Sequence, residues 1–117
     1  MSYIDGFVLA VPVANRDKYR EVARTAAEVF KAHGAQQVVE AWGDDVPEGK
    51  VTSFTMAVQR KDDEAVVFSW IQWPSREARD AGMKASMADP RLNMDMENMP
   101  FDAKRMIFGG FEALVEA

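Results

Sequence analysis

The sequence has no cysteine and a single histidine, His33. Without cysteine, disulfide frameworks, thiolate nucleophiles and zinc-thiolate sites are all excluded. One histidine leaves too few ligands for a borderline metal, so we expect neither a metal nor a cofactor. A chain that uses no disulfide suits the reducing cytosol, and we predict a cytoplasmic location.

Positive charge and long apolar runs are also scarce. The chain carries 14 Lys and Arg against 19 Asp and Glu, a net charge of −5, and the basic residues form no block. Nucleic-acid backbones are bound by clustered Lys and Arg, so no nucleic-acid partner is expected. The apolar run near the N-terminus is about ten residues long, far short of the roughly 20 that cross a bilayer, so neither a signal peptide nor a membrane anchor is expected.

The sequence does contain enough apolar material for one core. Of its 117 residues 48% are hydrophobic, and no repeat, low-complexity tract or linker divides them. We therefore expect residues 1–117 to form one domain. A domain of this size is only marginally stable, and association with a partner would add to its stability.

Local patterns predict two helices. Asn15 is a suitable N-cap and Gly34 a suitable end for a helix whose apolar residues recur at helical spacing. Ser75 can cap a second helix that runs to about Ala88. This helix carries a stripe of small residues that includes Gly82, which permits a close approach to a sheet.

Strands are predicted over residues 3–13, 35–42, 51–59, 65–73 and 106–111. Residues 51–59 alternate cleanly and are expected to pair with 65–73 as an antiparallel hairpin. We interpret the order as β-α-β-β-α-β, the ferredoxin-like α+β fold. In this fold two helices cover one face of a four-stranded antiparallel sheet, here followed by a short C-terminal strand.

The other face of such a sheet is open. By alternation, Ser53 and Thr55 are expected on this open face. The first strand is expected to place Tyr3, Asp5, Phe7 and Leu9 beside them, while Phe54, Met56 and Val58 face the helices. Large contiguous apolar patches mark interaction sites, so we predict a homodimer whose two sheets pack face to face around an apolar pocket.

Four stretches resemble a known family: YIDGFVLAVP, WGDDVPEGKVTSF, VVFSWIQWPS and MPFDAKRMIFGGFE. They are similar, in order and at matching spacing, to the YbaA-like bacterial family (domain of unknown function 1428), which is placed among the dimeric α+β barrels. The resemblance implies a homodimer of ferredoxin-like subunits. It implies no activity, because the family has no established reaction, cofactor or catalytic residue.

Two charged residues are candidates for a pocket. Asp5 is a carboxylate in a nearly apolar strand, and a buried acid must be paired or neutralised. It is either a general base or part of an ion pair with Arg105 or a nearby lysine. Arg105 either holds a substrate carboxylate or forms a salt bridge with Asp102 or a partner chain.

Glu40, on the second strand, is a weaker candidate than Asp5 for the same two roles, a general base or part of an ion pair. An edge position would let its carboxylate reach solvent. Trp42 precedes Gly43, Asp44 and Asp45, and the two aspartates either bind a hard cation or, more simply, support a turn through backbone hydrogen bonds. We favour the turn.

Other conspicuous side chains have structural interpretations. His33 lies before Gly34 and is expected to cap a helix rather than to act in catalysis. Trp70 and Trp73 lie on opposite sides of their strand, so one is expected in the core and one at an interface. The methionines of the segment after the second helix either line an apolar pocket or fill gaps: Met94, Met96 and Met99.

Three functions remain open. The first is a homodimer that binds a small organic ligand between its sheets. The second is a cofactor-free monooxygenase or isomerase with Asp5 as base and Arg105 as anion clamp. The third is an interaction protein that docks a partner on residues 91–105. The candidate pocket residues are Asp5, Phe7, Glu40, Trp42, Ser53, Thr55 and Arg105.

Overall fold

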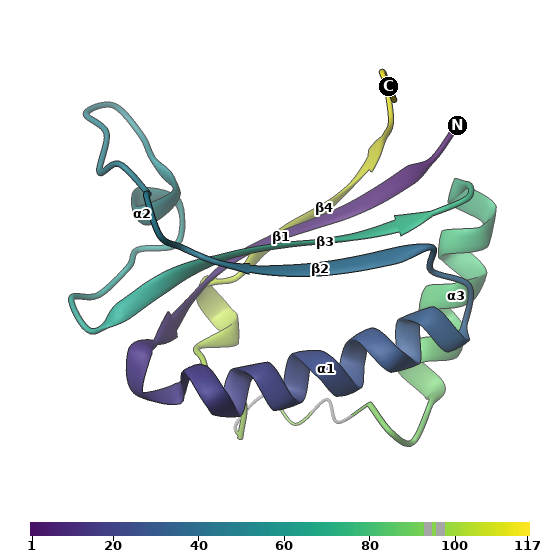
Figure 1. Ribbon diagram of the computed structural model, residues 1–117, viewed down its shortest axis with the longest axis horizontal. Coiled ribbons are helices and arrows are strands. Elements are labelled where there is room, and N and C mark those ends of the chain that lie inside the picture. The colour runs from purple at the N-terminus through teal and green to yellow at the C-terminus, as the bar shows by residue number, and fades with distance from the viewer. Residues whose placement is uncertain (93–94, 96–97) are drawn as a thin grey trace.

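The computed structural model describes residues 1–92, 95 and 98–117 of the chain. Figure 1 shows the arrangement of the elements. The strands are β1 (Tyr3–Pro12), β2 (Gln37–Trp42), β3 (Glu64–Trp73) and β4 (Ile107–Glu112). The helices are α1 (Arg16–Ala32), α2 (Phe54–Ala57) and α3 (Arg76–Ala88), with short 3₁₀ turns η1 (Val13–Asn15) and η2 (Ala103–Arg105).

The four strands form one antiparallel sheet in the order β2-β3-β1-β4. Helices α1 and α3 both lie against the same face of this sheet (Figure 1). The C-terminal strand β4 is itself the fourth strand of the sheet, paired with β1. Two helices on one face of a sheet in this strand order are the ferredoxin-like arrangement that the sequence predicts.

Helix α1 follows most of its sequence signals, although the Asn15 side chain does not cap it and donates instead to the carbonyl oxygen of Pro100 over 3.1 Å. Tyr19, Ala23 and Val29 form its buried stripe. Gly34 takes φ +111°, a conformation that glycine adopts without strain, and so ends the helix. His33 occupies the C-cap, as expected, and its Nε2 lies 2.9 Å from a carboxylate oxygen of Asp89, which links the ends of α1 and α3.

Helix α3 packs closely because of its small residues. Ser75 accepts a hydrogen bond of 3.1 Å from the backbone N–H of Ala78, as an N-cap should. A Cβ at Gly82 would lie 2.3 Å from the ring of Trp73 and 2.5 Å from the carbonyl oxygen of His33. Only a glycine permits this approach, so the predicted close contact is confirmed.

The predicted strand over residues 51–59 is wrong. This segment forms the single-turn helix α2, in which the Ser53 hydroxyl accepts a hydrogen bond of 3.0 Å from the N–H of Met56. The expected hairpin partner β3 has no free edge, because β1 pairs with one of its sides and β2 with the other. The alternation of residues 51–59 therefore marks no strand face: Phe54 and Met56 are exposed, whereas Thr55 and Val58 are buried.

The predicted orientation of β1 is also wrong. Leu9 and Val11 pack against Tyr19 of α1, so the odd-numbered residues of β1 face the helices. Tyr3, Asp5 and Phe7 lie on this covered side as well, and the open face receives the even-numbered residues. Both faces of β1 are largely apolar, so its own pattern could not determine the orientation.

Among residues 1–92, 95 and 98–117, no helix is both long enough and apolar enough to span a membrane.

Candidate functional site

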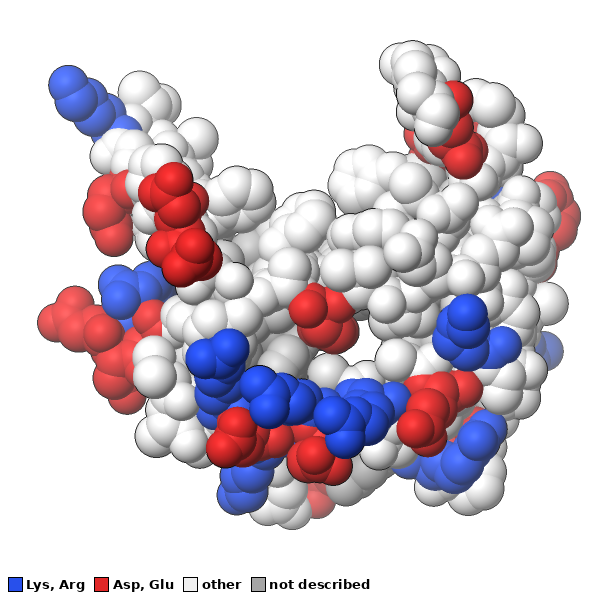
Figure 2. Space-filling view, in the orientation of Figure 1, with Lys and Arg blue, Asp and Glu red and all other residues white. Residues whose placement is uncertain are grey.

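A recess of about 390 Å³ lies between α1 and the edge strand β2. We call it the α1–β2 recess. Figure 2 shows a hollow at this level of the molecule, above a row of basic side chains that follows α1. The recess is lined by Arg16, Tyr19, Arg20, Ala23, Arg24, Ala27, Val38, Glu40, Ala41, Trp42 and Val67.

Helical and strand periodicities bring these side chains together. Arg16, Arg20 and Arg24 are spaced by four residues and form one ridge of α1. Tyr19, Ala23 and Ala27 form the neighbouring ridge, which points toward the sheet. Alternate residues of β2, namely Val38, Glu40 and Trp42, face α1 across the recess.

A hydrogen-bonded pair joins Tyr19, which is buried on α1, to Glu40, which is exposed on the edge strand β2. The Tyr19 hydroxyl donates to Oε1 of Glu40 over 2.5 Å. Removal of water by the surrounding protein raises the pKa of Glu40, although hydrogen bonds from Tyr19 and Ser69 oppose this rise. Burial and the neighbouring carboxylate also raise the pKa of Tyr19, so its hydroxyl remains a donor.

The outer rim of the recess is basic. The Arg16 guanidinium lies over the Trp42 ring, 5.2 Å from its centroid. Arg20 is 3.8 Å from Asp17 and Arg24 is 3.6 Å from Glu21, and all four side chains are more than half exposed. Exposed ion pairs at such distances are weak, so these guanidiniums can turn toward an anion at little cost.

Of the predicted pocket residues, Glu40 and Trp42 line the recess, and Asp5 and Phe7 do not. Asp5 is buried between α3 and the sheet, where it accepts hydrogen bonds from Arg79 (2.9 Å) and from the indole N–H of Trp73 (3.0 Å). Its ionic partner is thus Arg79 rather than Arg105. Phe7 packs in the cluster that contains Trp73 and lies 6.3 Å, ring to ring, from Phe108.

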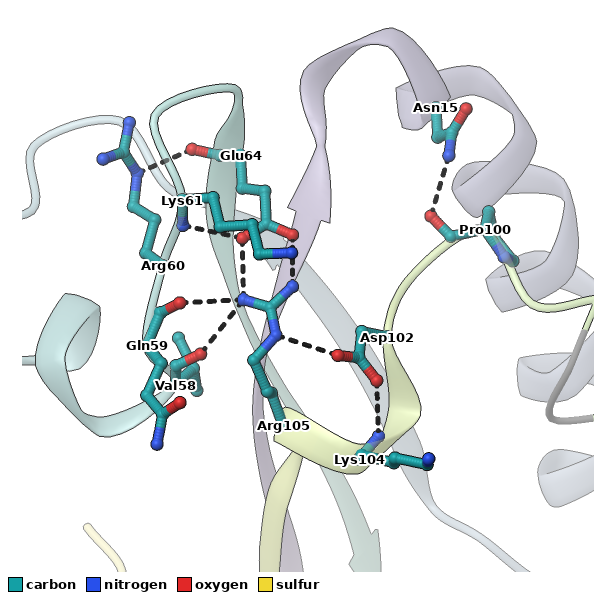
Figure 3. Close-up of polar contacts among 10 residues, drawn as sticks. All are labelled: Asn15, Val58, Gln59, Arg60, Lys61, Glu64, Pro100, Asp102, Lys104 and Arg105. Atoms are coloured by element: carbon teal, nitrogen blue, oxygen red, sulfur yellow. Dashed lines mark hydrogen bonds and ion pairs between the residues drawn. The ribbon is translucent and has the colours of Figure 1, made fainter.

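Arg105 is fully engaged within the protein (Figure 3). Its guanidinium donates to both carboxylate oxygens of Glu64, at 2.6 and 2.8 Å, and to Asp102 at 3.0 Å. It also donates to the backbone carbonyl oxygen of Gln59 at 2.9 Å. Of the two alternatives for Arg105, the salt bridge with Asp102 is therefore confirmed, and the residue holds the start of β3, the turn after α2 and η2 together.

Asp5 and Arg105 act at separate ends of the sheet. Asp5 pairs with Ile71 in the β1–β3 register, whereas Glu64, the partner of Arg105, pairs with Pro12. The intervening stretch of strand is about 23 Å long. The mechanism in which Asp5 is the base and Arg105 the clamp is therefore excluded by the geometry.

Ser53 and Thr55 lie away from the recess as well. Their hydroxyl oxygens are 2.8 Å apart, and Thr55 donates to Glu48 over 3.2 Å. They stabilise the loop around α2, so their predicted place on the open sheet face is wrong.

The remaining candidates can be placed briefly. Trp73 is buried and Trp70 is half-buried on the opposite side of β3, as predicted. Within the described ranges, no group of three His, Asp or Glu residues that could hold a metal is found. Met94 and Met96 lie outside the described residues, and Met99 is half-buried.

Sequence reasoning missed the basic ridge and the tyrosine of the recess. The spacing of Arg16, Arg20 and Arg24 was a visible signal, since residues four apart share one helix face. The spacing alone could not show that β2 lies opposite this face of α1.

The sheet surface opposite the helices, the open sheet face, is a second notable feature. On this side of the sheet, even-numbered residues of β1 pair with even-numbered residues of β3. They also pair with odd-numbered residues of β4 on their other edge. Helix α2 lies over one end of it, and the two chain termini project beyond the other (Figure 1). Its exposed apolar residues include Phe68 (44% exposed), Ile107 (45%) and Phe111 (61%).

Comparisons of sequence identify relatives of this chain. The family model described as "Protein of unknown function (DUF1428)" matches residues 2–103. The chain is 55% identical over 116 residues to proteins described as "Uncharacterized protein YbaA" from Escherichia coli strain K12 and from Shigella flexneri. These matches cover 99% of this chain and 99% of each relative.

Comparisons of structure confirm the ferredoxin-like α+β fold. Rv0793 from Mycobacterium tuberculosis matches with a TM-score of 0.55 and 14% identity, over 100% of this chain and 99% of that one. A dimeric ferredoxin-like protein from an uncultured marine organism matches with a TM-score of 0.55 and 11% identity, over 99% of this chain and 98% of that one. At these identities the likeness establishes the fold alone.

Proposed function

The chain belongs to the DUF1428 family, whose function is unknown, and we propose that it is a homodimeric protein that binds a small organic ligand. The two subunits share their open sheet faces. Each holds its ligand in the α1–β2 recess. The observation that carries the binding function is the convergence of the Tyr19–Glu40 pair, an apolar wall and a basic rim on one hollow of about 390 Å³.

Self-association is supported by the surface of the single chain. It exposes 7722 Å², whereas a compact monomer of 13.1 kDa exposes about 6,400 Å², so the excess is about 1,300 Å². That excess is comparable with what one partner contributes to a stable interface. One structural neighbour is described as dimeric, which agrees with this proposal.

Charge also favours the open sheet face as the contact. Each chain carries a net charge of −5, so two copies repel one another at a distance. In Figure 2 the upper surface between the two projecting ends is mostly uncharged. Contact through this surface buries apolar side chains and brings few like charges together.

Within the single chain, the recess is a better ligand site than the hollow beside the open sheet face. A hollow of about 120 Å³ lies near α2, beside the open sheet face, with an almost wholly apolar lining that includes Phe54 and Phe68. Typical small-molecule sites measure about 300–1,000 Å³. The recess falls within that range, and the smaller hollow does not.

An enzyme that transfers protons is the second candidate. The favouring observation is Glu40, a carboxyl with a raised pKa in a recess open to small molecules. Glu40 would then be the base in place of Asp5, with Tyr19 as the group that orients it. The predicted cytoplasmic location fits either function.

The dimer is tested by sedimentation velocity at several concentrations. The wild type is expected at twice the subunit mass, and Ile107→Glu is expected to be monomeric. Met87→Glu is the matched control, because Met87 on α3 is exposed to nearly the same extent (44% against 45%) on the helix side. A wild type that stays monomeric at every concentration, or a Met87→Glu monomer, contradicts the proposal.

Ligand binding is tested by backbone-amide NMR with a library of small organic fragments. At least one fragment is expected to shift the signals of β2 and the facing turns of α1. If no fragment shifts them, the recess is not a binding site. Shifts confined to Phe68 and the residues around α2 would place the ligand between the sheets.

A further inference from the structure

We infer that the ligand of the α1–β2 recess is a small organic oxyanion, a carboxylate or phosphate on an apolar ring, that also carries a hydroxyl directed at Glu40. This inference rests on the proposed function, since it names the chemical class that the recess accepts.

The first step concerns the anionic head. Arg20 and Arg24 lie on one ridge of α1, and their distances to their nearest carboxylates, 3.8 and 3.6 Å, exceed a good charge-assisted hydrogen bond. By contrast, Arg79 and Arg105 are bound to buried carboxylates at 2.9 and 2.6 Å. The guanidiniums at the recess are thus available for a planar oxyanion.

The second step concerns the body of the ligand. The apolar wall of the recess is formed by Ala23, Ala27, Val38 and Val67. The two alanines leave space where longer side chains would fill the recess. Trp42 closes one end with Arg16 over its ring. These surfaces suit a flat apolar body such as one aromatic ring.

The third step concerns the opposite end of the ligand. Glu40 accepts hydrogen bonds from Tyr19, on Oε1, and from Ser69, and a carboxylate has about four acceptor sites. A hydroxyl of the ligand can use one of the remaining sites. A second carboxylate beside Glu40 would be repelled, so the ligand must place its anion at the arginines and its hydroxyl at Glu40.

Cationic ligands fit this arrangement poorly. An amine would gain from Glu40, but it would meet three guanidiniums along the rim: Arg16, Arg20 and Arg24. A neutral ring would leave those guanidiniums without a partner. The combination of charges therefore selects a hydroxylated anion over both.

The class is tested with single-ring probes that differ in one group each. The probes are 4-hydroxybenzoate, 4-hydroxyphenyl phosphate, benzoate, 4-hydroxybenzyl alcohol and tyramine, titrated into the full chain by NMR. The two hydroxylated anions are expected to bind the recess at least about tenfold more tightly than the alcohol or the amine. Preference between carboxylate and phosphate then identifies the head group.

Variants show which residues cause this preference. Arg20→Gln with Arg24→Gln is expected to abolish the advantage of 4-hydroxybenzoate over 4-hydroxybenzyl alcohol. Arg76→Gln is the control, because Arg76 is likewise an exposed helix arginine with a weak partner, Asp80 at 3.9 Å, and it lies on α3 outside the recess. This control is expected to bind every probe as the wild type does.

Glu40→Gln tests the hydroxyl contact and keeps the size of the side chain. Loss of its negative charge is expected to strengthen benzoate binding and to reduce the preference for 4-hydroxybenzoate over benzoate several-fold. An unchanged preference overturns the predicted hydroxyl contact. If the alcohol or the amine shifts the recess signals as much as the anions do, or more, the anion class is overturned but the proposed function stands. If no probe and no fragment shifts them, both are overturned.

Discussion

Tyr19 of α1 donates its hydroxyl proton to the Glu40 carboxylate of β2, and this bond joins the first helix to the edge strand of the sheet. Both residues line the recess, so the pair places a carboxyl with a raised pKa in it.

The first prediction concerns this bond. Tyr19→Phe removes a hydrogen bond that lowers the pKa of Glu40, so that pKa is expected to rise further. The free energy of unfolding is expected to fall by about 1 kcal/mol. NMR titration of the Glu40 carboxyl and urea denaturation measure the two effects. Tyr3→Phe, which keeps Glu40 bonded, serves as the control, and an unchanged Glu40 titration in Tyr19→Phe contradicts the assignment.

The second prediction concerns the buried ion pair of Asp5 and Arg79. Asp5→Asn leaves the Arg79 guanidinium without its carboxylate, and the loss of stability is expected to be about 3 kcal/mol. The exposed partner of the same arginine provides the control. Asp80→Asn breaks a contact of 2.8 Å at the surface and is expected to cost less than about 1 kcal/mol. If urea denaturation shows the same loss of unfolding free energy for both variants, burial does not determine how strongly the ion pair stabilises the protein.

The third prediction concerns acid stability. Hydrogen bonds from Arg105 lower the pKa of buried Glu64 from its ordinary value of 4.5. The stability that follows is complete above pH 4.5 and is lost as the pH falls through the lower, folded-state value.

Glu64→Gln should therefore be less stable than the wild type at pH 7, by about 3 kcal/mol. The difference should shrink in acid. Denaturant titrations at several pH values measure it, with Glu77→Gln on the exposed start of α3 as the control. A constant difference between pH 7 and pH 3 would argue against the role of Glu64.

The fourth prediction concerns Gly82. A Cβ at this position would overlap Trp73 and the His33 carbonyl, so Gly82→Ala is expected to cost about 2 kcal/mol or more. At Gly109 an added Cβ would come no closer than 3.5 Å to the Phe111 ring. Gly109→Ala is accordingly expected to change the melting temperature little, and similar melting temperatures for the two variants would refute the close packing of α3.

Part of the site could be read from the sequence. Glu40 and Trp42 were named as pocket candidates, and both line the recess, although their binding role remains a prediction. The basic ridge was present as a regular spacing of arginines, but a helix surface exposed to water shows the same spacing. Arg79 could not be paired with Asp5 from sequence, because 74 positions separate them and only the packing of α3 brings them together.

The sequence by itself determined the elements whose signals are local. The glycine end of α1, the Ser75 cap and small residues of α3 and the opposite sides of Trp70 and Trp73 follow from periodicity and backbone preference within a few residues. Only the tertiary structure decided that residues 51–59 form no strand and that Asp5 faces the helices. Both depend on which strand edge is already paired and which face a distant helix covers. The alternation of apolar and polar side chains along a segment contains neither piece of information.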